Sequence, residues 1–398
     1  MEEEKRMYEP LKGVKVIDCS HAGSGPSCTK ILTEYGADTI WVEPLKGTST
    51  RSVFKYDFYA TGKRSITLDL KSDKGMAVLN KLIQHTDVFV SNFRTAALSR
   101  LKLTYEHLKL INNRIIYATI TGFGEEGSDA DNPGYDPVAF WARGGMLVDF
   151  AEKGNLLHPP IAVGDIATGQ ALAGGICASL YKREKTGEGS RVFTSLLAQA
   201  TYLNHDAIIE SQYGEKYPKC RCAPRRALLN TYRCRDNKWI VITIPSDFDR
   251  YFPSLLNVIG RNDLIGDPRW TCIEDTMYEK APELVEILDE AFGKMTQEEA
   301  LAALEAIDAP VGKVQNTKEM MKDPQVLKNN YLFEIQSSDS KALMIPANPV
   351  KFADKNCGVV GFKRGPRLGA HSVEILKEHG YTEAEIQDLV DNNIVSQC

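Results

Sequence analysis

The chain has 398 residues, of which 43% are hydrophobic and 25% are charged, and this length leaves room for two or three globular domains. Its formal net charge of −5 argues against a dedicated nucleic-acid-binding protein. No apolar run approaches the ~18 residues of a membrane span, and the acidic start lacks the apolar core of a signal peptide.

The first half of the chain alternates short β-branched runs with segments of helical period. This alternation predicts an α/β protein with a mostly parallel sheet, whose ligand binds beyond the carboxyl ends of the strands. Strands are predicted at residues 14–19, 38–43, 65–70, 87–90, 114–120 and 191–194. Helices are predicted at residues 26–35, 72–85, 166–182 and 196–210, with Ser72 and Gly187 as caps.

A second, smaller α+β unit is predicted after residue 212, where the composition changes. Residues 216–226 are rich in basic residues and cysteine and are typical of a linker. A hairpin is predicted at residues 231–244, followed by helices at 248–259, 278–292 and 297–306. The chain then ends in two predicted helices at 369–380 and 382–392, the latter capped by Thr382.

The nine cysteines form no disulfide framework, which favours reduced thiols and a cytoplasmic location. Cys220, Cys222 and Cys234 come closest to a zinc signature. They lack the second cysteine or histidine pair of such a site, so we predict no metal centre.

The glycines at residues 23–25 follow the first strand and precede a helix, with Pro26 near its first position. The N–H groups of a helix start could bind an anion there. Glu43 ends the next strand, where an NAD site would place its ribose-binding acid, but Cys28 replaces the third glycine of that motif. The glycines at residues 122–127 lie among acidic residues and are predicted to form a turn.

Several basic side chains fall near the ends of predicted strands. Their convergence on one edge of the sheet in an acidic protein predicts a polyanionic ligand, such as a nucleotide diphosphate. These residues are Lys63, Arg64, Lys71, Arg94 and Arg100.

Asp165 lies immediately before a predicted helix rich in glycine and alanine, which indicates a closely packed central element. The residue fits two interpretations, a helix N-cap or a carboxylate kept ionised in a dry cleft so that it can act as a nucleophile. Asp136 competes for the second role, but its Asn-Pro-Gly-Tyr-Asp context is explained by a turn. There is no Gly-x-Ser-x-Gly motif, and His21 is interpreted as a packing or hydrogen-bonding residue.

Five stretches resemble the class III CoA-transferases, the formyl-CoA/carnitine CoA-transferase (CaiB/BaiF-like) family. They occur in the family's order along nearly the whole chain, so the resemblance is specific. The stretches are Leu11-Lys-Gly-Val-Lys-Val-Ile-Asp18 with Gly25-Pro26, Gly62-Lys-Arg-Ser-Ile-Thr-Leu-Asp-Leu-Lys71, Ile161-Ala-Val-Gly-Asp165 with Gly169, Lys182-Arg-Glu-Lys-Thr-Gly-Glu-Gly189, and Gly365-Pro-Arg-Leu-Gly-Ala-His371.

The resemblance implies a Rossmann-like large domain, a smaller α+β domain and an intertwined homodimer. Residues 1–212 would form the first part of the large domain and 213–228 a linker. Residues 229–318 would form the small domain, and 319–398 would return to complete the large one. The family moves CoA between carboxylic acids, so acyl-CoA and free acids are the implied substrates, with no tightly bound cofactor.

Carried over residue by residue, the family nucleophile falls on Asp165. It would react through an acyl-aspartyl anhydride and an aspartyl-CoA thioester. The family's CoA contacts, carried over in the same way, include some members of the basic cluster described above. The expected CoA contacts are Gly23, Ser24, Leu68, Asp69, Leu70, Lys71, Asn92, Phe93, Arg94, Arg100 and Tyr135.

Two departures from formyl-CoA members disfavour oxalate and formate: Gly23 replaces a glutamine, and Ile244-Pro-Ser-Asp247 replaces a glycine run. Residues 132–145 instead resemble members acting on 2-hydroxy acids and their 2-enoyl partners, such as phenyllactate and 2-hydroxyisocaproate. Two alternatives stay open. One is an NAD-linked oxidoreductase that uses the first glycine loop and Glu43. The other is a non-catalytic CoA- or nucleotide-binding protein in which Asp165 is only a cap.

Overall fold

The computed structural model describes residues 9–52, 55–336, 342–352 and 364–396. The chain divides into two compact units. The first unit contains residues 1–146, 159–206 and 324–398, and the second contains residues 147–158 and 207–323. Within the described ranges, no helix has the length and apolar character needed to cross a bilayer.

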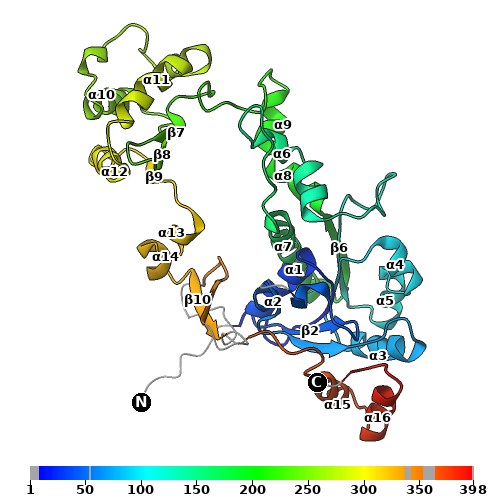
Figure 1. Ribbon diagram of the computed structural model, residues 1–398. Helices are drawn as coiled ribbons and strands as arrows, with labels where there is room; N and C mark the ends of the chain where they lie inside the picture. Colours follow the sequence, from blue (N-terminus) through cyan, green and yellow to red (C-terminus); the bar gives the residue numbers. More distant parts are fainter. Residues whose placement is uncertain (1–8, 53–54, 337–341, 353–363, 397–398) are drawn as a thin grey trace. The chain divides into compact units, whose positions relative to one another are not determined.

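The first unit is built on a six-stranded sheet of order β3-β2-β1-β4-β5-β6 (Figure 1). All neighbouring strands in it run parallel, which confirms the predicted α/β architecture. The strand order is that of dinucleotide-binding α/β folds, in which the order reverses between β1 and β4. The strands are β1 (Lys15–Cys19), β2 (Asp38–Glu43), β3 (Arg64–Thr67), β4 (Val88–Ser91), β5 (Ile116–Thr121) and β6 (Ser190–Ser195).

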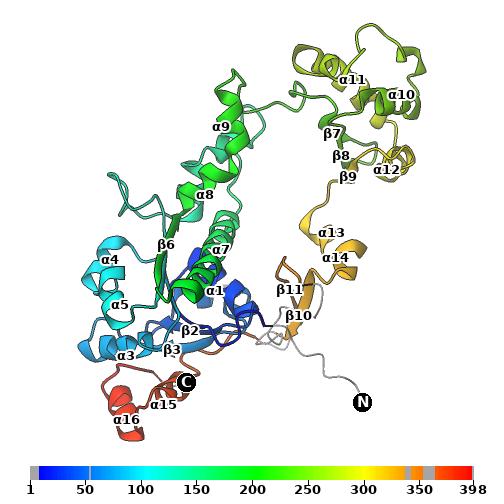
Figure 2. The ribbon, with the colours of Figure 1, turned by 180° about the vertical axis from the view of Figure 1, so that it is seen from behind.

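Helices cover both faces of this sheet (Figures 1 and 2). On one face, α1 (Ser24–Glu34) and α7 (Val163–Thr186) lie side by side and pack on the apolar side chains of β1, β4 and β5. On the other face, helices from the first third and from the C-terminal end of the chain share one core. Those helices are α3 (Asp73–Ile83), α4 (Thr95–Arg100), α5 (Tyr105–Ile111), α15 (Ser372–Glu378) and α16 (Glu383–Asp391).

The second unit contains the predicted hairpin, which is extended by a third strand, and helices that pack on it. Its regular elements are β7 (Leu229–Arg233), β8 (Trp239–Thr243), β9 (Val311–Lys313), α9 (His205–Ser211, shared with the first unit), α10 (Phe248–Val258), α11 (Ala281–Phe292), α12 (Gln297–Glu305), α13 (Thr317–Met320) and the short turns η3 (Asn262–Leu264), η4 (Ile273–Thr276) and η5 (Tyr278–Lys280). The remaining elements are η1 (Ser49–Ser52), α2 (Tyr56–Ala60), η2 (Asp136–Ala142), α6 (Met146–Asp149), α8 (Leu196–Leu203), α14 (Pro324–Lys328), β10 (Leu332–Gln336) and β11 (Ala342–Pro346).

The three predicted helix caps are confirmed. Ser72 accepts the Gly75 N–H, Thr382 forms a capping box with Glu385, and Gly187 ends α7 at a φ of +76°. The single helix predicted at residues 196–210 is wrong, because α8 ends at Leu203 and α9 begins at His205. Asn204 separates them: its backbone N–H makes the last bond of α8, to the Ala200 carbonyl at 2.9 Å, and its side-chain amide donates to the Gly144 carbonyl at 3.3 Å.

Lys63 and Arg64 were predicted to face a polyanionic ligand, and the structure contradicts this. Both begin or precede β3, whereas ligand sites of such sheets lie at the carboxyl ends. Lys63 Nζ lies 3.0 Å from Asp18 Oδ2, and both side chains are fully buried. Arg64 pairs with Asp38 and with two glutamates of α15. These residues therefore stabilise the unit rather than bind a ligand.

The substitution Lys63→Met is expected to lower the free energy of unfolding by about 3–5 kcal/mol, because it leaves the Asp18 carboxylate buried without its cation. Urea unfolding followed by circular dichroism measures this. The matched control is Lys74→Met, whose ion pair with Asp388 is half-exposed at 54% and 53% and is worth about 1 kcal/mol at most. Equal effects of the two substitutions would contradict the buried-pair account.

Candidate active site

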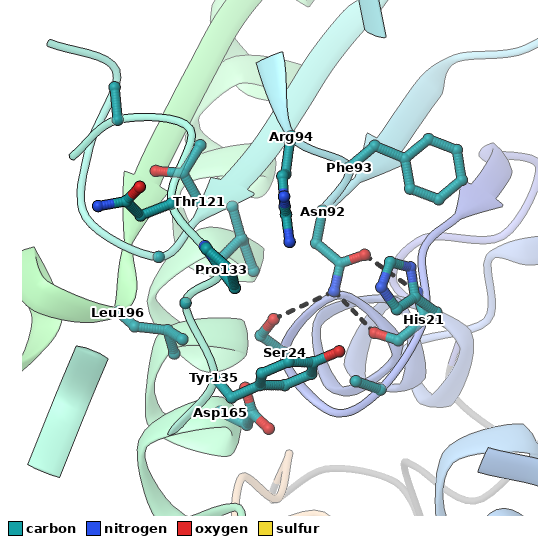
Figure 3. Close-up of a pocket in the computed structure, with 16 residues that line it drawn as sticks. His21, Ser24, Asn92, Phe93, Arg94, Thr121, Pro133, Tyr135, Asp165 and Leu196 are labelled. Carbon is teal, nitrogen blue, oxygen red and sulfur yellow. Dashed lines mark hydrogen bonds between the residues drawn. The ribbon is translucent and has the colours of Figure 1, made fainter. Parts of the chain in front are cut away.

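A pocket opens at the carboxyl ends of β1, β4 and β5 (Figure 3). It adjoins the point between β1 and β4 where the strand order reverses, which is where open α/β sheets bind ligands. The loops that follow β1 and β4 form one side, and the loop after β5 forms the other. The lining residues are His21, Ala22, Ser24, Asn92, Phe93, Arg94, Ile120, Thr121, Gly122, Ala130, Asn132, Pro133, Gly134, Tyr135, Asp165 and Leu196.

Two glycines allow α1 and α7 to approach closely beneath the pocket. A Cβ on Gly169 of α7 would lie 2.7 Å from the Ser24 carbonyl oxygen of α1. A Cβ on Gly23 would lie 2.2 Å from Asp165 Oδ2. Side chains at either position would therefore force the two helices apart, and the lack of one at Gly23 lets the Asp165 carboxylate reach the first loop.

Asp165 occupies the first turn of α7 rather than its N-cap, so the interpretation of this residue as a cap is wrong. The N-cap is Ala162, whose left-handed φ of +72° turns the chain into the helix. α7 begins at Val163, three residues earlier than the predicted start, because residues 163–165 are already helical. The carboxylate of Asp165 is thus free of the local capping role and faces the pocket.

The electrostatic surroundings make Asp165 an unusually basic carboxylate. Burial, and after it the nearby Asp136 carboxylate, raise the pKa of Asp165 from 3.8 to about 7. Lys55 and hydrogen bonding from the Ser24 hydroxyl and backbone N–H act in the opposite direction. A carboxylate that is costly to ionise yet partly ionised at neutral pH is suited to act as a nucleophile.

Asp136 was interpreted as an ordinary turn residue, and this is wrong. It begins η2 (Asp136–Ala142) and is only 2% exposed. Its carboxylate faces the start of α7, where a Cβ on Gly164 would lie 2.5 Å from Asp136 Oδ1. Burial raises the pKa of Asp136, while the N–H groups of Ala162, Gly164 and Asp165 lower it. In the sequence, this position is marked only by an acidic residue directly before a proline, and a turn explains that pattern equally well.

Tyr59 is a second residue that the sequence did not indicate. It is 3% exposed and lies on α2, and burial followed by the charges of Asp165 and Asp136 raises the pKa of its phenol. Tyr59 therefore stays protonated beside the two carboxylates. No motif surrounds it in the sequence, so only the fold reveals this position.

The structure brings together part of the predicted CoA-binding set. The residues that line the pocket together with Asp165 are Ser24, Asn92, Phe93, Arg94 and Tyr135. Gly23 lies directly against the Asp165 carboxylate. The exposed Arg94 points into the pocket in Figure 3.

The remaining predicted CoA contacts do not line the pocket. Leu68 is buried in the core under α3, and the Asp69 side chain accepts the Lys71 N–H at 3.0 Å. Lys71 and Arg100 are exposed. Leu68, Asp69, Leu70 and Lys71 follow β3, two strands from the switch point, which explains their distance from the pocket lining.

The geometry argues against a dinucleotide site that uses Glu43. This carboxylate is 1% exposed, accepts from Arg51 Nε at 2.7 Å and from the Ser65 hydroxyl at 2.7 Å, and so is already committed to partners within the protein. The glycines at residues 122–127 lie in a loop with no helix start, as predicted. Over the described part of the chain, no group of three or more His, Cys, Asp or Glu residues is arranged to hold a metal.

A buried carboxylate with a raised pKa, in a pocket at the switch point of a parallel α/β sheet, is typical of an enzyme active site. Comparison with known proteins identifies the class more closely. Residues 11–372 match the family model described as CoA-transferase family III. The chain is 33% identical over 399 residues to the (R)-2-hydroxy-4-methylpentanoate CoA-transferase of Clostridioides difficile, covering 97% of this chain and 99% of that protein.

Other relatives agree. The cinnamoyl-CoA:phenyllactate CoA-transferase of Clostridium sporogenes is 32% identical over 408 residues, covering 98% of this chain and 97% of that protein. Formyl-CoA:oxalate CoA-transferases are further relatives. A crystal structure of a CaiB/BaiF family protein from Brucella suis has a TM-score of 0.80 at 26% identity and covers 94% of this chain and 100% of that one.

The chain therefore belongs to CoA-transferase family III and is an enzyme of that class.

Proposed function

We propose that the enzyme transfers CoA from an acyl-CoA to a free carboxylic acid, with Asp165 as the covalent nucleophile. The observation that carries the proposal is the buried Asp165 carboxylate, whose pKa is raised to about 7, at the switch-point pocket. The exposed Arg94 guanidinium in the same pocket supplies a positive charge for an anionic substrate.

The reaction proceeds in four steps that balance without redox change or net proton transfer. Asp165 Oδ attacks the thioester carbon, the C–S bond breaks, and CoA thiolate leaves from an acyl-aspartyl anhydride. The thiolate then attacks the Asp165 carboxyl carbon and expels the first acid, giving an aspartyl-CoA thioester. The incoming carboxylate attacks the same carbon and expels thiolate. The thiolate finally takes the new acyl group and frees Asp165.

CoA is proposed to extend from this pocket along the carboxyl edge of the sheet. Gly23, Ser24, Asn92, Phe93, Arg94 and Tyr135 would contact its thiol end and nearby groups, because they surround Asp165. The exposed cations Lys71 and Arg100, with the neighbouring Asp69 and Leu70, would contact the more distant part, while Leu68, only 1% exposed, would support this stretch from the core. A surface with several exposed cations suits the phosphate groups of CoA.

The substrate pair is proposed to be a 2-hydroxy acid and a 2-enoyl-CoA. Two relatives at 32–33% identity bear names of 2-hydroxy-acid CoA-transferases, which supports this choice. The pocket also contributes apolar side chains, namely Phe93, Ile120, Pro133 and Leu196, which suit a medium-sized hydrophobic acyl group.

A panel experiment tests the proposal. The purified protein is incubated with 2-enoyl- or 2-hydroxyacyl-CoA donors and with phenyllactate, 2-hydroxy-4-methylpentanoate, oxalate and formate as acceptors, and new acyl-CoAs are followed by mass spectrometry. Transfer to the 2-hydroxy acids is expected, with little to oxalate or formate. CoA binding without any transfer would favour the non-catalytic binding protein, and preferred transfer to oxalate would overturn the substrate proposal.

We also propose that the enzyme is a homodimer. The first unit exposes large apolar side chains on α7, β6 and α8: Tyr181, Phe193 and Tyr202 are 68%, 53% and 77% exposed. Burying such groups against a second chain would stabilise the assembly. Light scattering coupled to size-exclusion chromatography is expected to give the mass of two chains, and the mass of one chain would contradict the proposal.

A further inference from the structure

The side chain of Asn92 holds the loop between β1 and α1 in place. Its Oδ1 accepts the His21 N–H at 3.0 Å, and its Nδ2 donates to the His21 carbonyl at 2.7 Å and to the Ser24 hydroxyl at 3.4 Å (Figure 3). Both ends of the amide are thus engaged by one short loop. Asn92 follows β4 and the loop follows β1, so this contact spans the switch point of the sheet.

The Asn92–Ser24 contact has only one possible direction. An amide NH2 group can only donate, so Ser24 Oγ must be the acceptor. The Ser24 hydroxyl hydrogen is then available to another acceptor. Ser24 is 4% exposed and lines the pocket with Asp165, and both the hydroxyl and the N–H of Ser24 lower the pKa of that carboxylate. The same carboxylate lies directly against Gly23, the residue before this serine, where an added Cβ would lie 2.2 Å from Asp165 Oδ2.

We propose that the Ser24 hydroxyl, oriented by Asn92, acts with the Ser24 N–H to stabilise the negative charge that develops on Asp165 oxygen during CoA transfer. The inference rests on the proposed function. In the second and third steps the nucleophile attacks the Asp165 carboxyl carbon, and an electron pair moves onto its carbonyl oxygen before the leaving group departs. Two preoriented donors near that oxygen stabilise this oxyanion more than the neutral intermediate. Ser24 is then a catalytic residue and Asn92 a positioning residue.

The first test is Ser24→Ala, which keeps the N–H and removes the hydroxyl. We expect kcat to fall about 100-fold, with a change of only about twofold in KM for acyl-CoA, because the lost interaction belongs to the transition state. The hydroxyl lowers the pKa of Asp165, so its removal should also move the acid limb of the kcat/KM profile to higher pH. A purely structural serine would not move this limb.

Asn92→Ala is the second variant and carries the test if Ser24→Ala does not fold. It is expected to move the limb in the same direction, and the two substitutions together are expected to cost much less than the product of their separate effects, because they act on one donor. The matched control is Thr33→Ala on the same helix, whose buried hydroxyl bonds the Thr29 carbonyl and the Thr39 hydroxyl and does not line the pocket. It should leave the limb in place.

The inference is overturned if Ser24→Ala keeps the wild-type kcat and limb, or if the effects of Ser24→Ala and Asn92→Ala multiply independently. Failure of the proposed function looks different, because the wild-type protein would then transfer no CoA, or Asp165→Asn would retain transfer. A wild-type protein that transfers CoA through Asp165 while Ser24→Ala is unimpaired refutes only the role of the hydroxyl.

Discussion

Asp165→Asn is expected to lower kcat for CoA transfer by roughly 10⁴-fold or more, because an amide cannot form the anhydride or the thioester. The amide has nearly the same shape as the carboxylate, so binding of acyl-CoA should persist. Steady-state transfer, followed by mass spectrometry of the acyl-CoA products, measures the loss. Asp73→Asn is the matched control, since Asp73 lies in the first turn of α3 and is exposed. Retained transfer by Asp165→Asn would exclude this residue as the nucleophile.

The pH dependence of the thermal stability of Asp165→Asn shows whether this variant is folded. The pKa of Asp165 is raised from 3.8 to about 7, so its contribution to stability is fully present below pH 3.8 and is lost as the pH rises through about 7. The amide that Asp165→Asn introduces does not ionise and escapes this loss. Thermal melts should therefore show the variant to be more stable than the wild type at pH 8 and similar at pH 4. Equal stability at both pH values would contradict the raised pKa.

Asp136→Asn is expected to move the acid limb of the kcat/KM profile to lower pH by roughly one unit. Transfer requires ionised Asp165, and the Asp136 carboxylate opposes that ionisation, so the wild-type limb should lie near pH 7. Removing the charge makes Asp165 easier to ionise and less basic. We therefore expect the maximal rate to fall as well, since a weaker base is a weaker nucleophile.

The direction of this shift separates Asp136 from Ser24. Loss of the Ser24 hydroxyl should raise the limb and loss of the Asp136 charge should lower it, because the two groups act on Asp165 with opposite signs. Glu126→Gln is the matched control for Asp136→Asn, since Glu126 is an exposed acid in the loop that follows β5. An unchanged limb in Asp136→Asn, or the same change in Glu126→Gln, would refute the electrostatic coupling of the two aspartates.

Local sequence patterns were sufficient to predict the strands of the sheet and part of the site at their carboxyl ends. β1, β2, β4 and β5 are nearly fully buried and mostly apolar, so each appears in the sequence as a short, largely apolar run. Caps such as Ser72 and Gly187 depend on residues within one turn and were predicted for that reason. The position of Asp165 at the start of a central helix could be predicted as well, because a helix start is a local feature.

Contacts between distant segments could not be predicted in this way. Lys63 resembled a ligand-binding cation until its buried partner Asp18, from another strand, was known. Asp136 resembled a turn residue because the start of α7, which it faces, lies almost thirty residues further along the chain. The Asn92–Ser24 contact likewise joins loops that only the parallel sheet brings together. The sequence therefore located the site, while its electrostatics required the fold.

The most direct test of the central claim is to locate the covalent intermediate. Wild-type protein is incubated with a donor acyl-CoA that it turns over, quenched with hydroxylamine, digested and mapped by mass spectrometry. The account predicts a hydroxamate on Asp165 that depends on acyl-CoA, because both the anhydride and the thioester activate that carboxyl. Continued transfer with no label on Asp165, or with the label on another residue, would contradict it.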